Sequence, residues 1–361
     1  MKILILANSS NGLYRFRKML LDRLKAKGHE IYCVTPIINY KEELKTICEL
    51  EDIHIDRRGI NPIKDIKYYF NCMKAIKRIK PDMVLTYTIK PNIYGGLACR
   101  LKKIPYYANI TGLGTGFQND NIIRKIIVKM YKIALKKVET VFFQNQGNKD
   151  VFIKDRIIQE DKVCMLNGSG VDLQEFPFKQ MPEESKNINF LFIGRVMKEK
   201  GVDELFQAIE KIKKEYKNAE FSFIGGMEEN YKEKLQEHEQ EGLIKYYGSV
   251  KNVQDYIENA HCIVLPSYHE GMSNALLEGA AMGRALIASD IHGCKEAVID
   301  NKTGFLCKAK DQVSLYECLK KFIMLSYKKK EEMGLASRKH MEENFDKKEI
   351  VKKTINRLKL N

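Results

Sequence analysis

The sequence predicts an α/β fold made of two domains, each a parallel β-sheet covered by helices. Short apolar runs of strand length recur along the chain, and a turn and an amphipathic helix follow most of them. This alternation is typical of parallel sheets, because a crossover helix must join consecutive parallel strands. The length of 361 residues suits two domains, each large enough to bury its own core.

The composition is that of a globular protein that keeps its cysteines reduced. Hydrophobic residues make up 44% of the chain and charged residues 30%. The nine cysteines are scattered and form no C-x-x-C pair, which indicates free thiols in a reducing compartment. The apolar run after Met1 is too short for a signal peptide or a membrane span, so we expect a cytoplasmic protein. The seven histidines show no metal-ligand spacing and no D-x-D occurs, so no metal site is predicted.

The positive charge is concentrated in one half of the chain. Residues 1–180 hold 32 Lys and Arg against 18 Asp and Glu, or +14, and the remainder hold 30 against 29, or +1, which together give the net +15. The sequence has no zinc-finger spacing and no basic-aromatic interleaving, so a nucleic-acid partner is not predicted. We expect attraction to an anionic membrane surface or to a phosphate-bearing acceptor. A genome that favours lysine is the alternative explanation.

The first domain opens with a βαβ unit. Residues 1–7 form a strand, a turn of sequence NSSNG follows, and Gly28 ends the next helix before a strand at 30–34. The turn holds a single glycine, Gly12, so it lacks the G-x-G-x-x-G fingerprint of dinucleotide-binding proteins and a dehydrogenase has little support.

Two amphipathic helices follow in this domain. The segment 61–80 predicts a helix before the strand PDMVLTY, and the segment 121–139 predicts a helix with a basic face. The glycine-rich loop 109–117 between them suits either a mobile flap or a plain connection. We expect the apolar stripe of the second helix to cover the sheet, so that only its lysines face lipid headgroups. The first stripe comprises Ile66, Phe70, Met73 and Ile76; the second comprises Ile123, Ile126, Ile127, Met130, Ile133 and Ala134, opposite Lys125, Lys129, Lys132 and Lys136.

The polar, proline-containing segment 179–187 predicts the linker between the domains. The second domain then opens with a strand that ends at Ile193, followed by Gly194 and Arg195, and Lys200 and Gly201 begin the next helix. A cation directly after a strand, Arg195, and a second cation at the start of the next helix, Lys200, can converge on a diphosphate and neutralise its charge.

The stretch from His261 to Gly304 carries the most specific pattern. A buried strand, Ile263–Leu265, stops at Pro266, the turn SYHEGMS follows, and a helix runs from about Asn274 to Met282. The pattern predicts a phosphate seat, in which unpaired backbone N–H groups of residues 272–274 point into the crevice at the end of the strand. Glu270 and Glu278 frame this seat, and a carboxylate within the helix can accept hydrogen bonds from a ribose diol.

These residues resemble the signature of a known family. The string E-G-M-S-N-A-L-L-E, followed by G-R-A-L-I-A-S-D and G-C-K-E-A-V and preceded by G-R…K-G, is similar to the E-x7-E pattern of retaining family 4 glycosyltransferases. The resemblance extends over nearly the whole chain. It implies the GT-B fold, with two facing Rossmann-like domains, a cleft between them and a C-terminal crossover helix. Residues 1–180 would bind the acceptor, with 344–361 crossing back, and residues 181–343 would bind the nucleotide sugar.

The resemblance also implies an activity. It predicts transfer of a hexose, N-acetylhexosamine or uronic acid, with retention, from a nucleotide-diphosphate sugar, expected to be a UDP-sugar, to a glycan acceptor. Relatives that build capsular or undecaprenyl-diphosphate-linked glycans suggest a polyprenyl-diphosphate-linked acceptor and a peripheral position on the inner face of the cell membrane. No cofactor beyond the nucleotide sugar and no metal are expected. A nucleotide-sugar epimerase of the same fold and a non-catalytic nucleotide-sugar-binding protein are the alternatives.

The family motifs assign roles to individual residues. Related enzymes often place a histidine where this chain has Ile89, so the acceptor side departs from the pattern. Lys90 beside it is a candidate phosphate contact, although we favour a solvated surface lysine. Glu296 resembles a further family carboxylate, or it stabilises a helix start. The expected catalytic residues are Glu270, Arg195 and Lys200, and the expected substrate-binding residues are Gly271, Met272, Ser273, Asn274, Glu278, Gly12 and Ser249.

Overall fold

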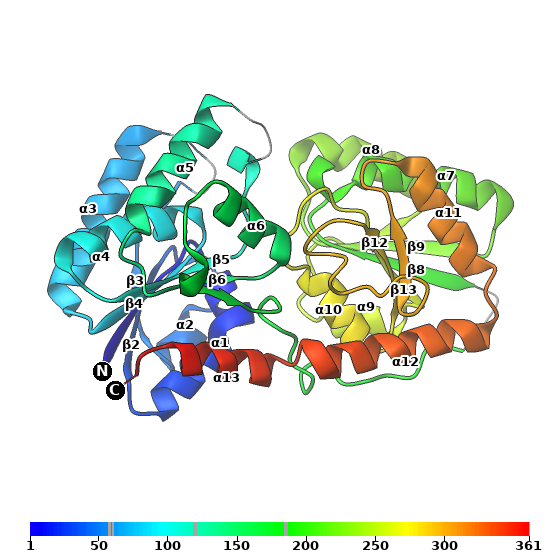
Figure 1. Ribbon diagram of the computed structural model, residues 1–361. Helices are drawn as coiled ribbons and strands as arrows, with labels where there is room; N and C mark the ends of the chain where they lie inside the picture. Colours follow the sequence, from blue (N-terminus) through cyan, green and yellow to red (C-terminus); the bar gives the residue numbers. More distant parts are fainter. Residues whose placement is uncertain (57–58, 60, 118–120, 184–186, 361) are drawn as a thin grey trace. The chain divides into compact units, whose positions relative to one another are not determined.

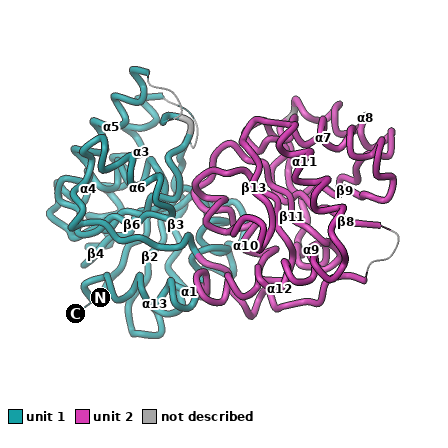
Figure 2. The backbone as a smooth tube through the Cα atoms, turned by 45° about the vertical axis from the view of Figure 1, so that its right-hand side comes forward, with its two compact units in different colours: residues 1–169, 348–361 teal, residues 170–347 magenta. Residues whose placement is uncertain are grey.

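The computed structural model describes residues 1–56, 59, 61–117, 121–183 and 187–360. The chain forms two compact units (Figure 2). Unit 1 comprises Met1–Ser169 and Lys348–Asn361, and unit 2 comprises Gly170–Lys347. The division falls at 169/170 and at 347/348, whereas the sequence suggested 180/181 and 343/344. Three residues of the expected linker, 184–186, lie outside the described residues.

The segment that begins at Gly170 belongs to unit 2 because it is bonded there. Val171 pairs with Asp346 as a parallel bridge, and its N–H donates to the carbonyl of Phe345 at 2.8 Å. Phe176 lies in the core of the unit. The buried guanidinium of Arg284 donates to the carbonyls of Lys179 and Gln180, the latter at 2.9 Å. Polar composition suggested a linker, but these contacts attach the first part of the segment to unit 2.

Unit 1 contains a seven-stranded parallel sheet with the order β3-β2-β1-β4-β5-β6-β7. Its strands read as nearly unbroken apolar runs because helices cover both faces of the sheet. Leu4 in the central strand pairs with Tyr32 on one side and Val84 on the other. The strands are β1 (Lys2–Leu6), β2 (Glu30–Thr35), β3 (Glu49–Asp52), β4 (Met83–Tyr87), β5 (Tyr106–Ile110), β6 (Thr140–Phe143) and β7 (Val163–Met165).

The two faces of this sheet carry different helices (Figure 1). One hydrophobic cluster joins the sheet to α3 (Pro62–Ile79), α4 (Gly96–Lys102), α5 (Ile122–Ala134) and α6 (Gln146–Lys154). A second cluster joins the opposite face to α1 (Ser10–Ala26), α2 (Lys41–Lys45) and the C-terminal helix α13 (Lys347–Arg357). Ile350, Val351 and Leu358 supply the apolar contacts of the C-terminal segment with unit 1. The last helix therefore returns to the first domain, as the family resemblance implied.

Two helices of unit 1 are rotated relative to the expected orientation. In α3 the core side comprises Tyr68, Cys72, Ala75, Ile76 and Ile79, while Ile66 and Phe70 are exposed. In α5 the buried residues are Tyr131 and Ala134, while Ile123, Ile126 and Ile133 are exposed. The expectation that the apolar stripe of α5 covers the sheet was therefore wrong for these three isoleucines, and the apolar face predicted for α3 is partly exposed. Aromatic packing fixes the rotation of α5, because the rings of Tyr131 and Phe152 meet edge to face with centroids 5.0 Å apart.

Unit 2 contains a six-stranded parallel sheet with the order β10-β9-β8-β11-β12-β13. Its core is continuous from β8 to the helices that flank the sheet. The strands are β8 (Ile188–Ile193), β9 (Ala219–Ile224), β10 (Lys245–Tyr246), β11 (Cys262–Leu265), β12 (Ala285–Ser289) and β13 (Gly304–Cys307). The helices are α7 (Val202–Glu215), α8 (Lys232–Gln240), α9 (Gln254–Glu258), α10 (Asn274–Ala281), α11 (Gln312–Ile323) and α12 (Tyr327–Asn344).

Both sheets have a topological switch point, where the chain turns from building one half of the sheet to building the other. In unit 1 this point lies between β1 and β4, and in unit 2 between β8 and β11. Ligands of open α/β sheets bind outside the carboxyl ends of the strands at such a point. The motifs G-R…K-G and E-x7-E follow β8 and β11, so the sheet order brings them to the same place.

Candidate functional site

The turn after β8 is held against the end of β11. Gly201 follows the 3₁₀ turn η4 (Lys198–Lys200) and has φ +68°. A Cβ atom at Gly201 would lie 2.0 Å from the carbonyl oxygen of Pro266, so a larger residue does not fit. Glycine is required here both for its backbone conformation and for the close approach. The result is that Lys200 lies beside the loop that follows β11.

Lys200 and Glu270 meet at this point. The ammonium Nζ of Lys200 contacts Oε1 of Glu270, and the hydroxyl of Ser267 donates to the same oxygen at 2.9 Å. The two side chains are 23% and 12% exposed. Two motifs that lie 70 residues apart in the sequence therefore share one ion pair at the switch point of unit 2. The pair is partly shielded from water, so its electrostatic interaction is stronger than that of a surface pair.

A second loop holds the Glu270 segment from the other side. Gly293 has φ +93°, and a Cβ atom there would lie 2.7 Å from the backbone oxygen of Glu270. The N–H of Gly293 donates to Oε2 of Glu296 at 2.6 Å, and His292 Nδ1 lies 2.9 Å from the other Glu296 oxygen. Glu296 thus positions the loop that packs on Glu270. The sequence analysis interpreted Glu296 only as a family carboxylate or as a residue that stabilises a helix start, and it did not predict this contact with the loop.

One part of the expected phosphate seat was wrong. The N–H of Ser273 was expected to be unpaired, but it donates to the carbonyl of Gly293 at 2.9 Å. The side-chain Oγ of Ser273 instead caps α10 by accepting from the N–H of Leu276 at 3.4 Å. The carbonyl of Gly293 accepts from this amide because a backbone carbonyl in a packed loop needs a hydrogen-bond donor.

The remaining predicted residues of this motif lie in and just before α10. Gly271 precedes Met272, and Asn274 is the first residue of the helix. The side chain of Met272 is buried in the core, so any ligand contact it makes would be through its backbone. Glu278 is buried in the second turn of α10, with only 9% of its surface exposed. A buried carboxylate is retained where polar partners satisfy it.

Arg195 pairs with a carboxylate other than that of Glu270. Its guanidinium lies 3.8 Å from the carboxylate of Glu228 and is half-exposed. Glu228 follows β9, the strand next to β8, and the sequence analysis did not single it out. The rule that strand ends of a parallel sheet meet at one edge could have drawn attention to it.

Ser249 lies beside the glycines that follow β8, β9 and β10, at the carboxyl ends of these strands. The N–H of Gly225 donates to the carbonyl of Gly248 at 2.7 Å, and a Cβ atom at Gly225 would lie 2.0 Å from the carbonyl oxygen of Gly194. The ends of β8, β9 and β10 are therefore in close backbone contact. Ser249 Oγ would lie 3.5 Å from a Cβ atom at Gly226.

Helix α1 begins at Ser10, within the predicted turn NSSNG, and its first turn contains one structural residue and one open position. Ser10 is buried, and its hydroxyl donates to the carbonyl of Asn39 at 2.8 Å and accepts from the N–H of Ile38 at 3.0 Å. It therefore fastens the loop after β2. A Cβ atom at Gly12 would meet nothing within 4 Å, so the space beside the first turn of α1 is open.

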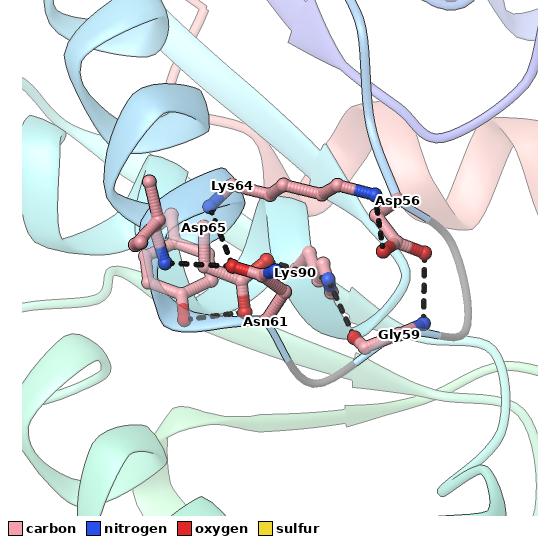
Figure 3. A network of polar contacts seen from close by, with 8 residues as sticks. Asp56, Gly59, Asn61, Lys64, Asp65 and Lys90 are labelled. Atoms are coloured by element: carbon pink, nitrogen blue, oxygen red, sulfur yellow. Dashed lines mark hydrogen bonds and ion pairs between the residues drawn. The ribbon is translucent and has the colours of Figure 1, made fainter.

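Lys90 is not the solvated surface lysine that the sequence analysis favoured (Figure 3). Its ammonium donates to Asp65 Oδ1 at 2.5 Å and to the carbonyl of Gly59 at 2.8 Å, and its side chain is only 14% exposed. Figure 3 shows this contact beside the Asn61 cap of α3. Ile89 is partly buried, with its Cδ1 2.6 Å from where a Cβ atom at Gly114 would lie. The glycine-rich loop therefore packs on the residue that replaces the family histidine.

Two further observations bear on the chemistry. Burial and the nearby Glu270 carboxylate raise the pKa of the Cys294 thiol, so this residue stays neutral and is a poor nucleophile. Within the part of the chain that the structure describes, no group of three His, Cys, Asp or Glu side chains is arranged to hold a metal ion.

Comparisons with known proteins define the class. The solved glycosyltransferase of Rickettsia africae ESF-5 superposes with a TM-score of 0.80 over 98% of this chain and 97% of its own, at 20% identity. That likeness shows the fold, which is the α/β architecture with two Rossmann-like domains that the sequence predicted. Residues 2–145 match the model "Glycosyl transferase 4-like", and residues 174–340 match "Glycosyl transferases group 1". The chain belongs to this glycosyltransferase family, and the predicted family is confirmed.

Two curated relatives cover most of the chain. The N,N'-diacetylbacillosaminyl-diphospho-undecaprenol alpha-1,3-N-acetylgalactosaminyltransferase of Campylobacter jejuni is 29% identical over 88% of both chains. The UDP-Gal:alpha-D-GlcNAc-diphosphoundecaprenol alpha-1,3-galactosyltransferase of Escherichia coli is 26% identical over 73% of this chain and 71% of its own.

Proposed function

We propose that this protein transfers a hexose-type sugar from a UDP-sugar, with retention of anomeric configuration, to a glycan carried on a polyprenyl diphosphate. The names of the two curated relatives support this substrate class, since both describe transfer to a diphosphoundecaprenol-linked sugar. The contact between Lys200 and Glu270 at the β8/β11 switch point carries the proposal, because it joins a cation and a carboxylate where a nucleotide is expected to bind.

The donor would be held at the edge of the unit 2 sheet. Lys200 would exchange part of its contact with Glu270 for the diphosphate, and Arg195 would leave the weak 3.8 Å contact with Glu228. Glu278 would accept from the ribose, and the backbone beside Ser249 would contact the base. Backbone groups of Gly271, Met272 and Asn274 would complete the phosphate contacts at the start of α10. Among these residues Arg195 is the most exposed cation and the freest to move.

The transfer exchanges one C–O bond for another. The bond between the anomeric carbon and the β-phosphate oxygen breaks, and a bond to the acceptor oxygen forms on the same face. The proton of the acceptor hydroxyl passes to the departing phosphate. Lys200 and Arg195 would stabilise the charge that develops on the diphosphate, and Glu270 would stabilise the positive charge that develops on the sugar. Such stabilisation accelerates the reaction because these charges are larger in the transition state than in the bound substrate.

A transfer assay tests this proposal. The protein is incubated with UDP-galactose or UDP-N-acetylgalactosamine and a synthetic lipid diphosphate sugar, and UDP release is measured with and without the acceptor. We expect acceptor-dependent release and an axial anomeric bond in the product, detected by NMR. A changed sugar without acceptor would support the epimerase instead. Failure to release UDP with the acceptors of both relatives would contradict transfer to this substrate class.

A basic, apolar face of unit 1 supports a peripheral membrane position. Ile122, Ile126 and Ile133 follow one side of α5 and are 68%, 52% and 43% exposed. The same helix exposes Lys125 and Lys129 next to this ridge. An amphipathic helix with exposed lysines and an uncovered apolar ridge binds anionic bilayers at the headgroup level.

The neighbouring helix α3 extends this surface. Ile63 is 80% exposed and Phe70 57% exposed, with Lys67 and Lys74 exposed on the same helix. Both helices pack on one hydrophobic cluster, so they cover the same face of the sheet. None of the helices in the described residues combines the length and the apolar character of a membrane span. Charge alone led to the membrane expectation, and the exposed isoleucines add shallow insertion to it.

A further inference from the structure

Arg17 lies on the core-facing side of α1. It is four residues from both Leu13 and Leu21, which are buried in the core of unit 1, so helical spacing places all three on one face. Arg15 of the same helix is exposed. An arginine on the apolar side of a helix is costly unless a partner compensates its charge.

The partner of Arg17 is an aromatic ring. Its guanidinium carbon lies 4.8 Å from the centre of the Tyr87 ring, and Tyr87 is a buried residue that ends β4. Burial lowers the pKa of the Arg17 guanidinium. Over the described ranges of the chain, no carboxylate or carbonyl oxygen accepts a hydrogen bond from it. A cation–π contact is weaker than a hydrogen-bonded ion pair at such a site.

Other arginines that are removed from water in this protein are better compensated. The guanidinium of Arg124 lies 2.6 Å from the carboxylate of Asp155. The fully buried guanidinium of Arg284 donates to four backbone carbonyls, including that of Ala260 at 3.1 Å. Arg17 therefore departs from the pattern that the rest of the chain follows, and its five N–H donors retain the capacity to bind an anion.

The fold places Arg17 at the switch point of the unit 1 sheet. Leu6 pairs with Thr86, so the carboxyl ends of β1 and β4 are adjacent, and α1 begins directly after β1. This is the same topological position that holds Lys200 and Glu270 in unit 2. The rule that puts ligands at the switch point applies to both sheets.

The backbone and the polar atoms at this point indicate an incomplete site. Thr88, directly after Tyr87, has φ +74°, a conformation that β-branched residues rarely adopt. Among the described residues, neither the buried hydroxyl of Thr88 nor the buried Oδ1 of Asn11 has a hydrogen-bond partner. The space next to Gly12 is open. Strain and unsatisfied polar atoms concentrate where a ligand completes the structure.

We propose that the carboxyl ends of β1 and β4, beside the open space at Gly12, form a second anion site in which Arg17 binds a diphosphate group. The planar guanidinium offers parallel N–H donors that match two phosphate oxygens, and it would do so while Tyr87 holds its other side. The choice of a diphosphate over other anions rests on the proposed function, whose donor and lipid-linked acceptor both carry one. The residue itself is identified by its half-buried position on the core-facing side of α1, and by the absence of an acid partner among the described residues.

Calorimetric titration with inorganic pyrophosphate tests the site directly. Four forms of the full chain are compared: wild type, Arg17→Gln, Lys200→Gln and the double variant. In the Lys200→Gln background, in which the unit 2 site is weakened, we expect Arg17→Gln to weaken pyrophosphate binding by about tenfold or more. Unchanged binding between Lys200→Gln and the double variant would overturn the proposal. An effect of Arg17→Gln without any effect of Lys200→Gln would support this site while contradicting the proposed donor site.

Matched variants separate binding from folding. Arg15→Gln removes a charge from the exposed side of the same helix, and we expect pyrophosphate affinity to stay within twofold of the wild type. Arg17→Gln removes an uncompensated cation, so the melting temperature without ligand should not fall. If that variant is unstable, Arg17→Lys is used instead. It keeps the charge but lacks the parallel N–H donors of the guanidinium, so it should bind pyrophosphate more weakly than the wild type does. If both Arg17→Lys and Arg17→Gln fold and bind pyrophosphate with wild-type affinity, the assignment is contradicted.

Two further titrations identify the source of the diphosphate. UDP represents the donor and geranyl diphosphate represents the lipid-linked acceptor. Weaker binding of geranyl diphosphate to Arg17→Gln, with unchanged UDP binding, assigns the site to the acceptor, and the reverse assigns it to the donor. Unchanged binding of both ligands would overturn the site.

Discussion

Lys200, Glu270 and Gly201 show how few residues position the candidate donor site. Gly201 lets the turn after β8 approach Pro266, and that approach delivers Lys200 to Glu270. Ser267 and the Gly293 loop then hold the Glu270 segment from two sides. The ion pair therefore depends on glycine backbone geometry as much as on charge. A change at Gly201 should disturb the site without altering any charged residue.

Gly201→Ala tests this dependence against a matched glycine. Gly242 also has φ +68°, but a Cβ atom there would meet nothing within 4 Å. Gly242→Ala should lower the free energy of unfolding by about 1 kcal/mol from backbone strain alone. Gly201→Ala carries the same strain and a clash with Pro266, so it should lose about 2 kcal/mol more. Urea denaturation measures both values, and equal losses would show that the contact with Pro266 is unimportant.

Sequence reasoning predicted the donor-site residues better than their contacts. The G-R…K-G and E-x7-E motifs identified Lys200 and Glu270 because their spacing after strands is specific. The pairing of Arg195 with Glu228, and the use of the Ser273 amide by Gly293, were not predictable because they depend on loops that lie together only in the folded chain. Lys90 was judged exposed, but Asp65 pairs with it from a helix 25 residues earlier in the sequence.

At the scale of single elements, α5 shows the limit of periodicity. The helix was predicted, and its lysines were placed on the exposed side, as the structure has them. Its apolar residues, however, cover more than half of the circumference, so periodicity could not say which of them face the sheet. The choice is made by Tyr131 packing against Phe152, a contact between two helices. The same ambiguity affected α3, where Tyr68 and Cys72 face the core.

Vesicle co-sedimentation tests the exposed ridge of α5. Replacing Ile122 and Ile126 together by Ser should weaken binding to phosphatidylglycerol-containing vesicles about tenfold, because two apolar side chains no longer enter the headgroup region. The double variant Val313→Ser/Leu335→Ser removes similarly exposed apolar side chains, 53% and 49% exposed, from unit 2 and serves as the control. Equal binding of both variants would contradict membrane docking through α5. Binding should also fall with added salt, since the lysines contribute through charge.

At the scale of the whole molecule, a buried arginine helps to attach the first segment of unit 2 to the rest of that unit. The chain enters unit 2 at Gly170, well before the polar stretch that suggested a linker. Arg284 donates to the carbonyls of Lys179, Gln180, Ala260 and Met282, and it thereby ties the entering segment to α10 and β12. The two parallel sheets were predictable from strand and helix spacing, and the return of the last helix was implied by the family resemblance. The boundary was not predictable, because hydrogen bonds to backbone carbonyls leave no pattern in the sequence.

Arg284→Met should release this segment. Four backbone carbonyls, two of them buried, would lose a charged donor, so the free energy of unfolding should fall by about 3 kcal/mol. Hydrogen exchange of residues 178–181 should accelerate, since the N–H of Lys179 bonds to the carbonyl of Met282 next to Arg284. Lys179→Met is the control, because its surface pair with Glu258 is about half-exposed and should contribute about 0.5 kcal/mol or less. Unaltered exchange in Arg284→Met would show that other contacts hold the segment.

The central claim is that Lys200 binds the diphosphate of the donor at the β8/β11 switch point. Calorimetric titration of UDP into wild type, Lys200→Met and Lys198→Met measures it most directly, because Lys198 is an exposed lysine of the same turn. We expect Lys200→Met to weaken UDP binding about tenfold or more, since a charge-assisted hydrogen bond to phosphate is lost. Lys198→Met should bind UDP as the wild type does. Equal UDP affinity in Lys200→Met and the wild type would contradict the account.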